Sequence, residues 1–227
     1  MVCCHAMTSP NPPRLADGIG IARFDQFVIV LDVHRDRYTR IGGSAALMLA
    51  AIDDGEMIDP DEPLVAALEE KGFVTSRASC ATPWLRPSDF LAPQVSALEG
   101  GSSHHSIGTR EFGIVIDCAA SRWALRRQPL LQILCDLPPS RARPRGGDIV
   151  TLARAFDHGR RLAPFTPCCL PDTLAFVRYA RRRGQFADIV FGVKCFPFEA
   201  HCWAQSGGMV LTDPLERVRR FVPMLAI

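Results

Sequence analysis

Several features that assign a function quickly are missing from this sequence. No Cys-x-x-Cys pair occurs among the nine cysteines, so neither a zinc ribbon nor a thioredoxin motif is indicated. There is no Gly-x-x-x-x-Gly-Lys-Ser/Thr segment, and hence no P-loop. No apolar run reaches the roughly 18 residues of a membrane-spanning helix. The first residues, MVCCHAMTSPNPPRLADG, lack the basic and apolar regions of a signal peptide. We therefore expect a cytoplasmic protein with reduced thiols and no metal.

A charge excess is missing as well. The chain has 26 basic and 24 acidic residues, for a formal net charge of +2. This balance does not predict nucleic-acid binding from charge alone. Apolar residues make up 48% of the 227 residues, which is enough for a packed core in one large domain or two small ones.

The N-terminal region has the pattern of a small mixed domain. Residues 1–18, with three prolines, are expected to be disordered. Phe27–Val33 and Arg37–Ile41 predict a β-hairpin. A first helix is expected to begin with Ser44 as its N-cap and to end at Gly55. A second is expected to begin at Pro63, capped by Asp59 or Asp61, and to end at Gly72. With a closing strand near residues 73–77, this order is typical of a winged-helix-like module.

The segment FVIVLDVHRDRYTRIGGSAALMLAAI resembles the precursor-peptide recognition element of pathways that modify ribosomally made peptides. The resemblance implies that a leader peptide binds along a strand edge by β-augmentation. It also implies that Val28, Ile29, Val30 and Tyr38 contact that peptide. A DNA-binding winged helix is the alternative, but residues 53–70 are rich in Asp and Glu, which phosphates disfavour.

The remaining chain predicts a second domain after a linker. Residues 75–97 are irregular and proline-rich, and the Gly- and Ser-rich residues 98–110 form the expected linker. The predicted domains are therefore residues 19–97, including a tether, and residues 111–227. In the second domain we expect a helix broken near Pro129 and a helix capped by Asp148.

Three residues near the C-terminus have the order of a nucleophile, its base and a group that orients the base. Cys169 lies at the start of a helix predicted for Leu170–Arg183, where the helix dipole favours a thiolate. His201 lies on a predicted strand, and Asp213 follows a glycine turn. We predict a three-residue Ser206–Gly208 loop with Gly208 in the left-handed conformation, because that register places Asp213 directly opposite His201. A two-residue turn would pair Asp213 with Cys202 instead.

General nucleophilic logic assigns the roles of these residues. Cys169 attacks a carbonyl, His201 transfers the proton, and Asp213 orients the imidazole. The Cys169 N–H is a candidate oxyanion donor. Trp203 and Phe198 are candidates for the substrate cleft, although a tryptophan on a buried strand also fits a core position. The neighbouring Cys168 leaves open which thiol reacts.

The C-terminal segments CLPDTLAFVRYARRRG, VFGVKCFPFEAHCWAQ and VLTDPLERVRRFVPML resemble the leader peptidase, or B protein, of lasso-peptide biosynthesis. This resemblance implies an α+β protein, with a winged-helix-like recognition module followed by a papain- or transglutaminase-like cysteine peptidase domain. The implied catalytic residues are Cys169, His201 and Asp213. The implied partners are a lasso precursor peptide and an asparagine-synthetase-like cyclase that makes the macrolactam. No intrinsic cofactor is implied, and any ATP dependence would arise through the cyclase.

Two other functions fit parts of the sequence. One is a peptide-binding adaptor of a modified-peptide pathway whose peptidase domain is inactive. The other is a winged-helix DNA-binding regulator.

Overall fold

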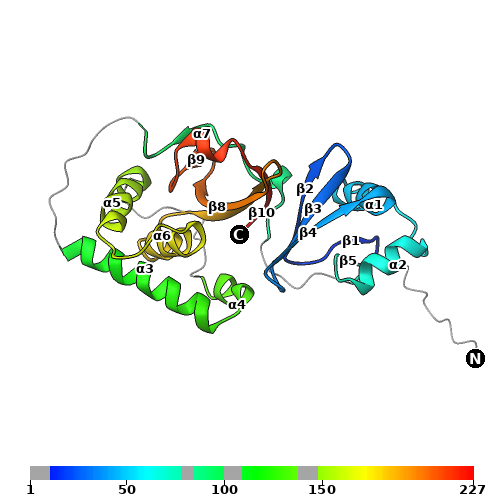
Figure 1. Ribbon diagram of the computed structural model, residues 1–227, viewed down its shortest axis with the longest axis horizontal. Helices are drawn as coiled ribbons and strands as arrows, with labels where there is room; N and C mark the ends of the chain where they lie inside the picture. The colour runs from blue at the N-terminus through cyan, green and yellow to red at the C-terminus, as the bar shows by residue number, and fades with distance from the viewer. Residues whose placement is uncertain (1–10, 78–83, 100–108, 138–147) are drawn as a thin grey trace, which may run out of the picture. The chain divides into compact units, whose positions relative to one another are not determined.

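A computed structural model describes residues 11–77, 84–99, 109–137 and 148–227. The chain divides into two compact units, residues 1–82 and residues 83–227. Figure 1 shows the first unit in blue to cyan and the second in green to red. Both units combine helices and strands, which confirms the α+β composition expected from the sequence.

An antiparallel three-stranded sheet forms one layer of the first unit. Its strands β2 (Ile19–Phe24), β3 (Phe27–Asp32) and β4 (Arg37–Gly42) follow one another in the order β2-β3-β4. The predicted hairpin is β3–β4, with Leu31 opposite Tyr38. The sequence pattern did not reveal β2, and this strand makes β3 the central strand of the sheet.

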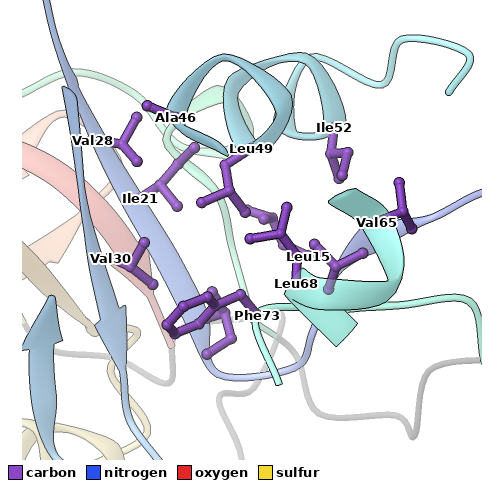
Figure 2. Packing of buried hydrophobic residues seen from close by; sticks show 12 residues of the cluster. Leu15, Ile21, Val28, Val30, Ala46, Leu49, Ile52, Val65, Leu68 and Phe73 are labelled. Carbon is purple, nitrogen blue, oxygen red and sulfur yellow. The ribbon is translucent and has the colours of Figure 1, made fainter. Parts of the chain in front are cut away.

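Two helices, α1 (Gly43–Asp53) and α2 (Pro63–Glu70), complete this unit. Figure 2 shows Ile21 and Val30 of the sheet directed towards Leu49 of α1 and Leu68 of α2, with Phe73 closing the cluster. The predicted helix ends are confirmed, because Gly55 and Gly72 have positive φ angles of 73° and 79°.

The predicted N-caps are wrong. Gly42 caps α1 in place of Ser44, and Glu62 caps α2 in place of the two aspartates. Strand β4 runs directly into α1, and Gly43, at a φ of 64°, turns the backbone there. The helix therefore begins before Ser44, which lies inside it.

The expected disorder of residues 1–18 does not hold for residues 11–18. Strand β1 (Arg14–Leu15) pairs with β5 (Val74–Thr75), and the Leu15 side chain is 2% exposed. Residues 1–10 lie outside the described residues. The described part of this unit contains two helices, and the winged-helix assignment stays a prediction.

The second unit is built on a five-stranded sheet with strand order β10-β7-β8-β9-β6. All neighbours are antiparallel except β6 and β9, which are parallel. The strands are β6 (Val95–Ser96), β7 (Asp188–Lys194), β8 (Glu199–Ser206), β9 (Met209–Val210) and β10 (Val222–Ala226).

Helices cover this sheet. Helix α6 (Cys169–Arg182) packs against β7 and β8, and α3 (Thr109–Arg127) packs on α5 (Ile149–Arg161) and α6. This arrangement can be followed in Figure 1. The shorter elements are α4 (Leu130–Cys135), α7 (Leu215–Val218) and the 3-10 turn η1 (Pro87–Asp89). As predicted, the chain breaks at Pro129 between α3 and α4, and the Asp148 side chain caps α5 by accepting from the Val150 N–H.

The predicted domain boundary needs correction. Residues 84–97, expected to be a tether of the first module, belong to the second unit. Leu85 bridges Ala226, and β6 pairs with β9 because an extended segment satisfies its backbone groups on a sheet edge. Most of the predicted linker, residues 98–110, lies outside the described residues. Within the described part of the chain, no helix has the length and apolar character to cross a membrane.

Gly192, on β7, tests how closely the Trp203 ring and β10 pack against this strand. It lies opposite His201, and a Cβ there would approach the Trp203 ring to 2.9 Å and the Val222 carbonyl oxygen to 3.0 Å. Gly192→Ala is therefore expected to lower the free energy of unfolding by about 1–3 kcal/mol. Denaturant unfolding measures this change.

Gly113→Ala is the matched control. A Cβ at Gly113, on α3, meets nothing within 4 Å, so alanine there is expected to be neutral or to stabilise the helix by up to about 1 kcal/mol. Equal unfolding free energies for the two variants would contradict the packing described for Gly192.

Candidate active site

Cys169 is the first residue of α6, as the sequence predicts. Cys168 caps the helix in an extended conformation, with φ −143° and ψ 126°. Pro171 lies in the first turn, where its missing N–H costs nothing. The first-turn N–H groups and the helix dipole favour negative charge at the Cys169 sulfur. Cys168 is exposed, whereas Cys169 is half-buried.

A carboxylate that sequence reasoning missed holds this helix start in place. Asp172 accepts the Cys168 N–H at 2.9 Å. The same carboxylate pairs with Arg122 of α3 and Arg160 of α5, each at 2.8 Å. The side chains of Asp172 and both arginines are mostly buried. An aspartate in the first helical turn was visible in the sequence, but its two partners lie on other helices.

His201 of β8 lies between the thiol and a carboxylate. Its Nε2 donates to Asp213 Oδ1 at 3.0 Å, and the imidazole also hydrogen-bonds Cys169, which leaves Nδ1 as the ring nitrogen for the sulfur. His201 and Asp213 are 4% and 8% exposed. The structure thus brings together all three residues predicted from the sequence.

The route by which Asp213 reaches His201 differs from the predicted one. Gln205 pairs with Val210 and Ser206 with Met209, so the turn is the two-residue Gly207–Gly208 turn and the predicted three-residue loop is wrong. The positive φ, 56°, belongs to Gly207, not to Gly208.

This register would place Asp213 on the wrong face if the strand continued. It does not, because β9 ends at Val210 and the backbone bends at residues 211–213. The Thr212 hydroxyl, in place of a main-chain carbonyl, accepts the Ala204 N–H at 3.0 Å. The bend frees the Asp213 side chain from strand alternation.

Neighbouring groups fix the position of Asp213. The buried Ser96 hydroxyl donates to the Asp213 carbonyl oxygen at 2.7 Å. The Thr212 hydroxyl donates to Asp213 Oδ2 at 3.0 Å, and the Arg217 guanidinium lies 3.8 Å from Oδ1. Sequence reasoning missed Ser96, which lies 117 residues earlier on β6.

The electrostatics favour a thiolate–imidazolium pair. A hydrogen bond from the Cys202 thiol, followed by one from His201, outweighs burial and lowers the pKa of Cys169 to about 4. Burial lowers the pKa of His201, but hydrogen bonds to Asp213 and Cys169 outweigh it and raise that pKa to about 9. Between these values the sulfur is negative and the ring positive.

A cavity of about 350 Å³ lies at the three residues of the candidate site. Cys169, His201 and Asp213 line it together with charged side chains of both signs, including Arg160, Arg161, Asp157 and Arg217. Nowhere in the described ranges do three or more His, Cys, Asp or Glu side chains form a group that suits a metal ion.

The two residues proposed for the cleft lie elsewhere. The Trp203 side chain is fully buried, and its indole N–H donates to Gln205 at 3.0 Å. It therefore packs in the core and does not wall the cleft. Phe198 is 54% exposed in the β7–β8 turn and is not among the residues that line the cavity.

Most of the residues predicted to bind a leader lie on the wrong strand for β-augmentation. Val28, Ile29 and Val30 belong to β3, which is paired on both sides, and each is at most 4% exposed. Tyr38 lies on β4, an edge strand. The error arises because the sequence analysis did not predict β2. In a hairpin of β3 and β4 without β2, β3 would be an edge strand.

A groove of about 590 Å³ runs beside β4 and ends against α2. The residues that line it are mostly basic or apolar. The charged ones are Asp32, Arg35, Arg37, Arg40 and Lys71, and the apolar ones include Ile41, Ala45, Leu68 and Phe73.

Comparison with known proteins gives one match. A family model described as the transglutaminase-like superfamily matches residues 112–226, which is just over half of the chain. No curated protein and no solved structure matches the chain.

The thiolate–imidazolium pair predicts a distinctive alkylation profile. The rate of iodoacetamide modification at Cys169, followed by peptide mass spectrometry, is expected to rise through a pH of about 4 and to stay high at neutral pH. Free cysteine, the control, reacts mainly above its ordinary pKa of about 8.5.

The variant His201→Ala removes one hydrogen bond that lowers the Cys169 pKa. Its profile is therefore expected to move to higher pH. A wild-type profile that matches free cysteine would contradict the ion pair.

Proposed function

The chain belongs to the transglutaminase-like superfamily, and from this membership we propose that residues 84–227 form a cysteine peptidase. The observation that carries the proposal is the contact of Cys169 with His201 and of His201 with Asp213, at the edge of an open cavity. A nucleophile, its base and a group that orients the base are the parts that thioester chemistry needs.

In the proposed reaction, the Cys169 thiolate attacks a peptide carbonyl. The tetrahedral oxyanion forms beside the N-terminus of α6, where the Cys169 N–H is a donor candidate. The His201 imidazolium gives its proton to the leaving amine, and the carbon–nitrogen bond breaks to leave a thioester. The neutral imidazole then takes a proton from water, which attacks the thioester and frees the thiolate. Asp213 keeps the ring oriented and stabilises its charged form.

We further propose that the substrate is a lasso precursor peptide and that the cut removes its leader. The free core amine then serves an asparagine-synthetase-like cyclase, which supplies any ATP chemistry. The support for this finer assignment is the resemblance of CLPDTLAFVRYARRRG and AHCWAQ to the leader peptidases of those pathways, together with a separate N-terminal unit that has a groove beside an edge strand.

In this proposal the leader binds beside β4. An extended peptide there would add a fourth strand, and its side chains would contact the apolar residues that line the groove. Tyr38 remains a candidate contact, whereas Val28, Ile29 and Val30 support the strand from within the core.

The charge of the groove predicts an acidic leader segment. Four cations and one carboxylate line the groove, and Asp32 already pairs with Arg35. Asp53, at the end of α1, and Asp54 do not line the groove and instead hold Arg23 at 2.8 and 2.7 Å.

The nucleophile assignment is tested with single variants. The substrate is the precursor peptide, which we expect to be encoded by a short reading frame next to the gene. Cys169→Ala is expected to abolish cleavage, because Cys169 is the thiol that hydrogen-bonds the base among the residues that the structure describes. Cys168→Ala, the control, is expected to retain most activity, since Cys168 is exposed and its backbone N–H makes the helix-start contact. Mass spectrometry of the products measures cleavage, and full activity in both variants would exclude this mechanism.

Leader binding is tested by charge reversal. The double variant Arg37→Glu with Arg40→Glu is expected to weaken binding of the labelled leader at least about tenfold, equivalent to about 1.4 kcal/mol. Added salt is expected to weaken wild-type binding. Fluorescence anisotropy measures both effects.

Arg77→Glu is the control for that experiment, because Arg77 is exposed and does not line the groove. Equal losses in both variants would contradict the groove as the binding site. Tighter binding of duplex DNA than of the leader would favour the alternative of a DNA-binding regulator. Tight leader binding with an intact Cys169 and no cleavage would favour the inactive adaptor.

A further inference from the structure

A second thiol touches the proposed nucleophile, and the mechanism does not use it. Cys202 follows His201 on β8, and its side chain hydrogen-bonds the Cys169 sulfur, as does its backbone N–H. The Cys202 side chain is buried, with 3% of the residue exposed.

The backbone around this contact is fixed. Thr173, one helical turn after Cys169 on the same face of α6, donates its hydroxyl to the Cys202 carbonyl oxygen at 3.3 Å. Helix α6 packs against β8 along this face. The two cysteines are therefore brought together by the packing of a helix on a sheet and not by a mobile loop.

The two sulfurs differ in access. Cys169 lines the open cavity, whereas Cys202 is not among the lining residues. A small oxidant in the cavity therefore meets Cys169 first. The hydrogen bond to Cys169, and then burial, raise the pKa of Cys202 well above its ordinary value, so Cys202 remains a thiol while Cys169 is a thiolate.

We propose that Cys169 and Cys202 form a reversible disulfide when a peroxide enters the site, with Cys169 as the oxidised thiol and Cys202 as the resolving thiol. In the first step the Cys169 thiolate attacks one peroxide oxygen, and the O–O bond breaks. The sulfur becomes a sulfenic acid, and the departing hydroxide takes the proton of the His201 imidazolium to leave as water.

In the second step the Cys202 sulfur attacks the sulfenic sulfur. The S–S bond forms, the S–O bond breaks, and the hydroxide leaves with the Cys202 proton as a second water. Two thiols and one hydrogen peroxide thus give one disulfide and two waters. The thiolate that raised the Cys202 pKa is gone by then, so this thiol is easier to deprotonate when it must react.

The disulfide takes up the Cys169 thiolate, so the enzyme is inactive while the bond lasts. It also prevents irreversible oxidation of that sulfur. A sulfenic acid without a resolving thiol is oxidised further to sulfinic and sulfonic acids, which dithiothreitol does not reduce. Formation of this bond depends on the geometry of the two thiols and not on the peptidase activity proposed above.

The experiment treats the full chain with hydrogen peroxide, blocks remaining thiols and maps tryptic peptides without reduction. Trypsin places Cys168 and Cys169 in one peptide, residues 162–178, and Cys195 and Cys202 in another, residues 195–217. We expect these two peptides to be cross-linked, with loss of the alkylatable Cys169 thiol and its full recovery after dithiothreitol.

Variants identify the two sulfurs. The cross-link is expected to persist in Cys168→Ser and Cys195→Ser. It is expected to be lost in Cys202→Ser and Cys202→Ala, where Cys169 instead gains the mass of two or three oxygens and dithiothreitol no longer restores its thiol. Two Cys202 variants are used because Cys202 is buried, and a circular dichroism spectrum checks that each is folded.

Other outcomes overturn the proposal. A Cys168–Cys169 disulfide within one peptide would make the neighbouring cysteine the resolving thiol. A cross-link that survives in both Cys202 variants would exclude Cys202. Irreversible oxidation of wild-type Cys169, or no oxidation of it, would show that the two thiols do not act together.

Discussion

The contact between the N-terminus of α6 and strand β8 is the constraint on which the second unit depends. The Thr173 hydroxyl donates to the Cys202 carbonyl oxygen. Cys169, one turn earlier on α6, hydrogen-bonds His201 on the same strand. From the other side, Asp172 joins the helix start to α3 and α5 through two arginines. Removal of one partner from such a buried ion pair leaves an uncompensated charge, at a cost of about 3–5 kcal/mol. The position of the nucleophile is therefore tied to the stability of the helical layer.

The features that depend on local sequence signals, such as the ends of helices, were predicted well from the sequence. Proline, glycine and apolar spacing located α6 to within a residue. Residue order made the contact of Cys169, His201 and Asp213 one possibility, and the resemblance to the leader peptidases singled these residues out. The predicted route to Asp213 is wrong because the hairpin is short. Strand β9 has two residues, and strand parity says nothing about a side chain beyond the strand end. Asp213 is thus the correct partner of His201, although the strand register predicted for it is wrong.

The remaining errors concern contacts that are distant in sequence. Ser96 supports Asp213 from β6, and Arg122 and Arg160 reach Asp172 from separate helices; no periodicity encodes such pairs. The expected edge strand was misplaced because the sequence pattern does not reveal β2, and an edge is a property of the whole sheet. Composition also does not place charges in space: the acidic residues between positions 53 and 70 are not among those that line the groove beside β4, where basic residues outnumber acidic ones.

The site and the groove differ in what they can recognise. The cavity at Cys169 is small, at about 350 Å³, and its lining carries charges of both signs, so it offers little to distinguish one peptide from another. The groove beside β4 is larger, at about 590 Å³, and its lining combines mostly basic charged residues with apolar ones. If a leader binds there, the cleavage step becomes intramolecular, and a short flexible segment of the peptide between its leader and its cleavage site gives an effective concentration in the millimolar range. A cleavage site with weak intrinsic affinity is then sufficient, because selection has already taken place where the leader is bound.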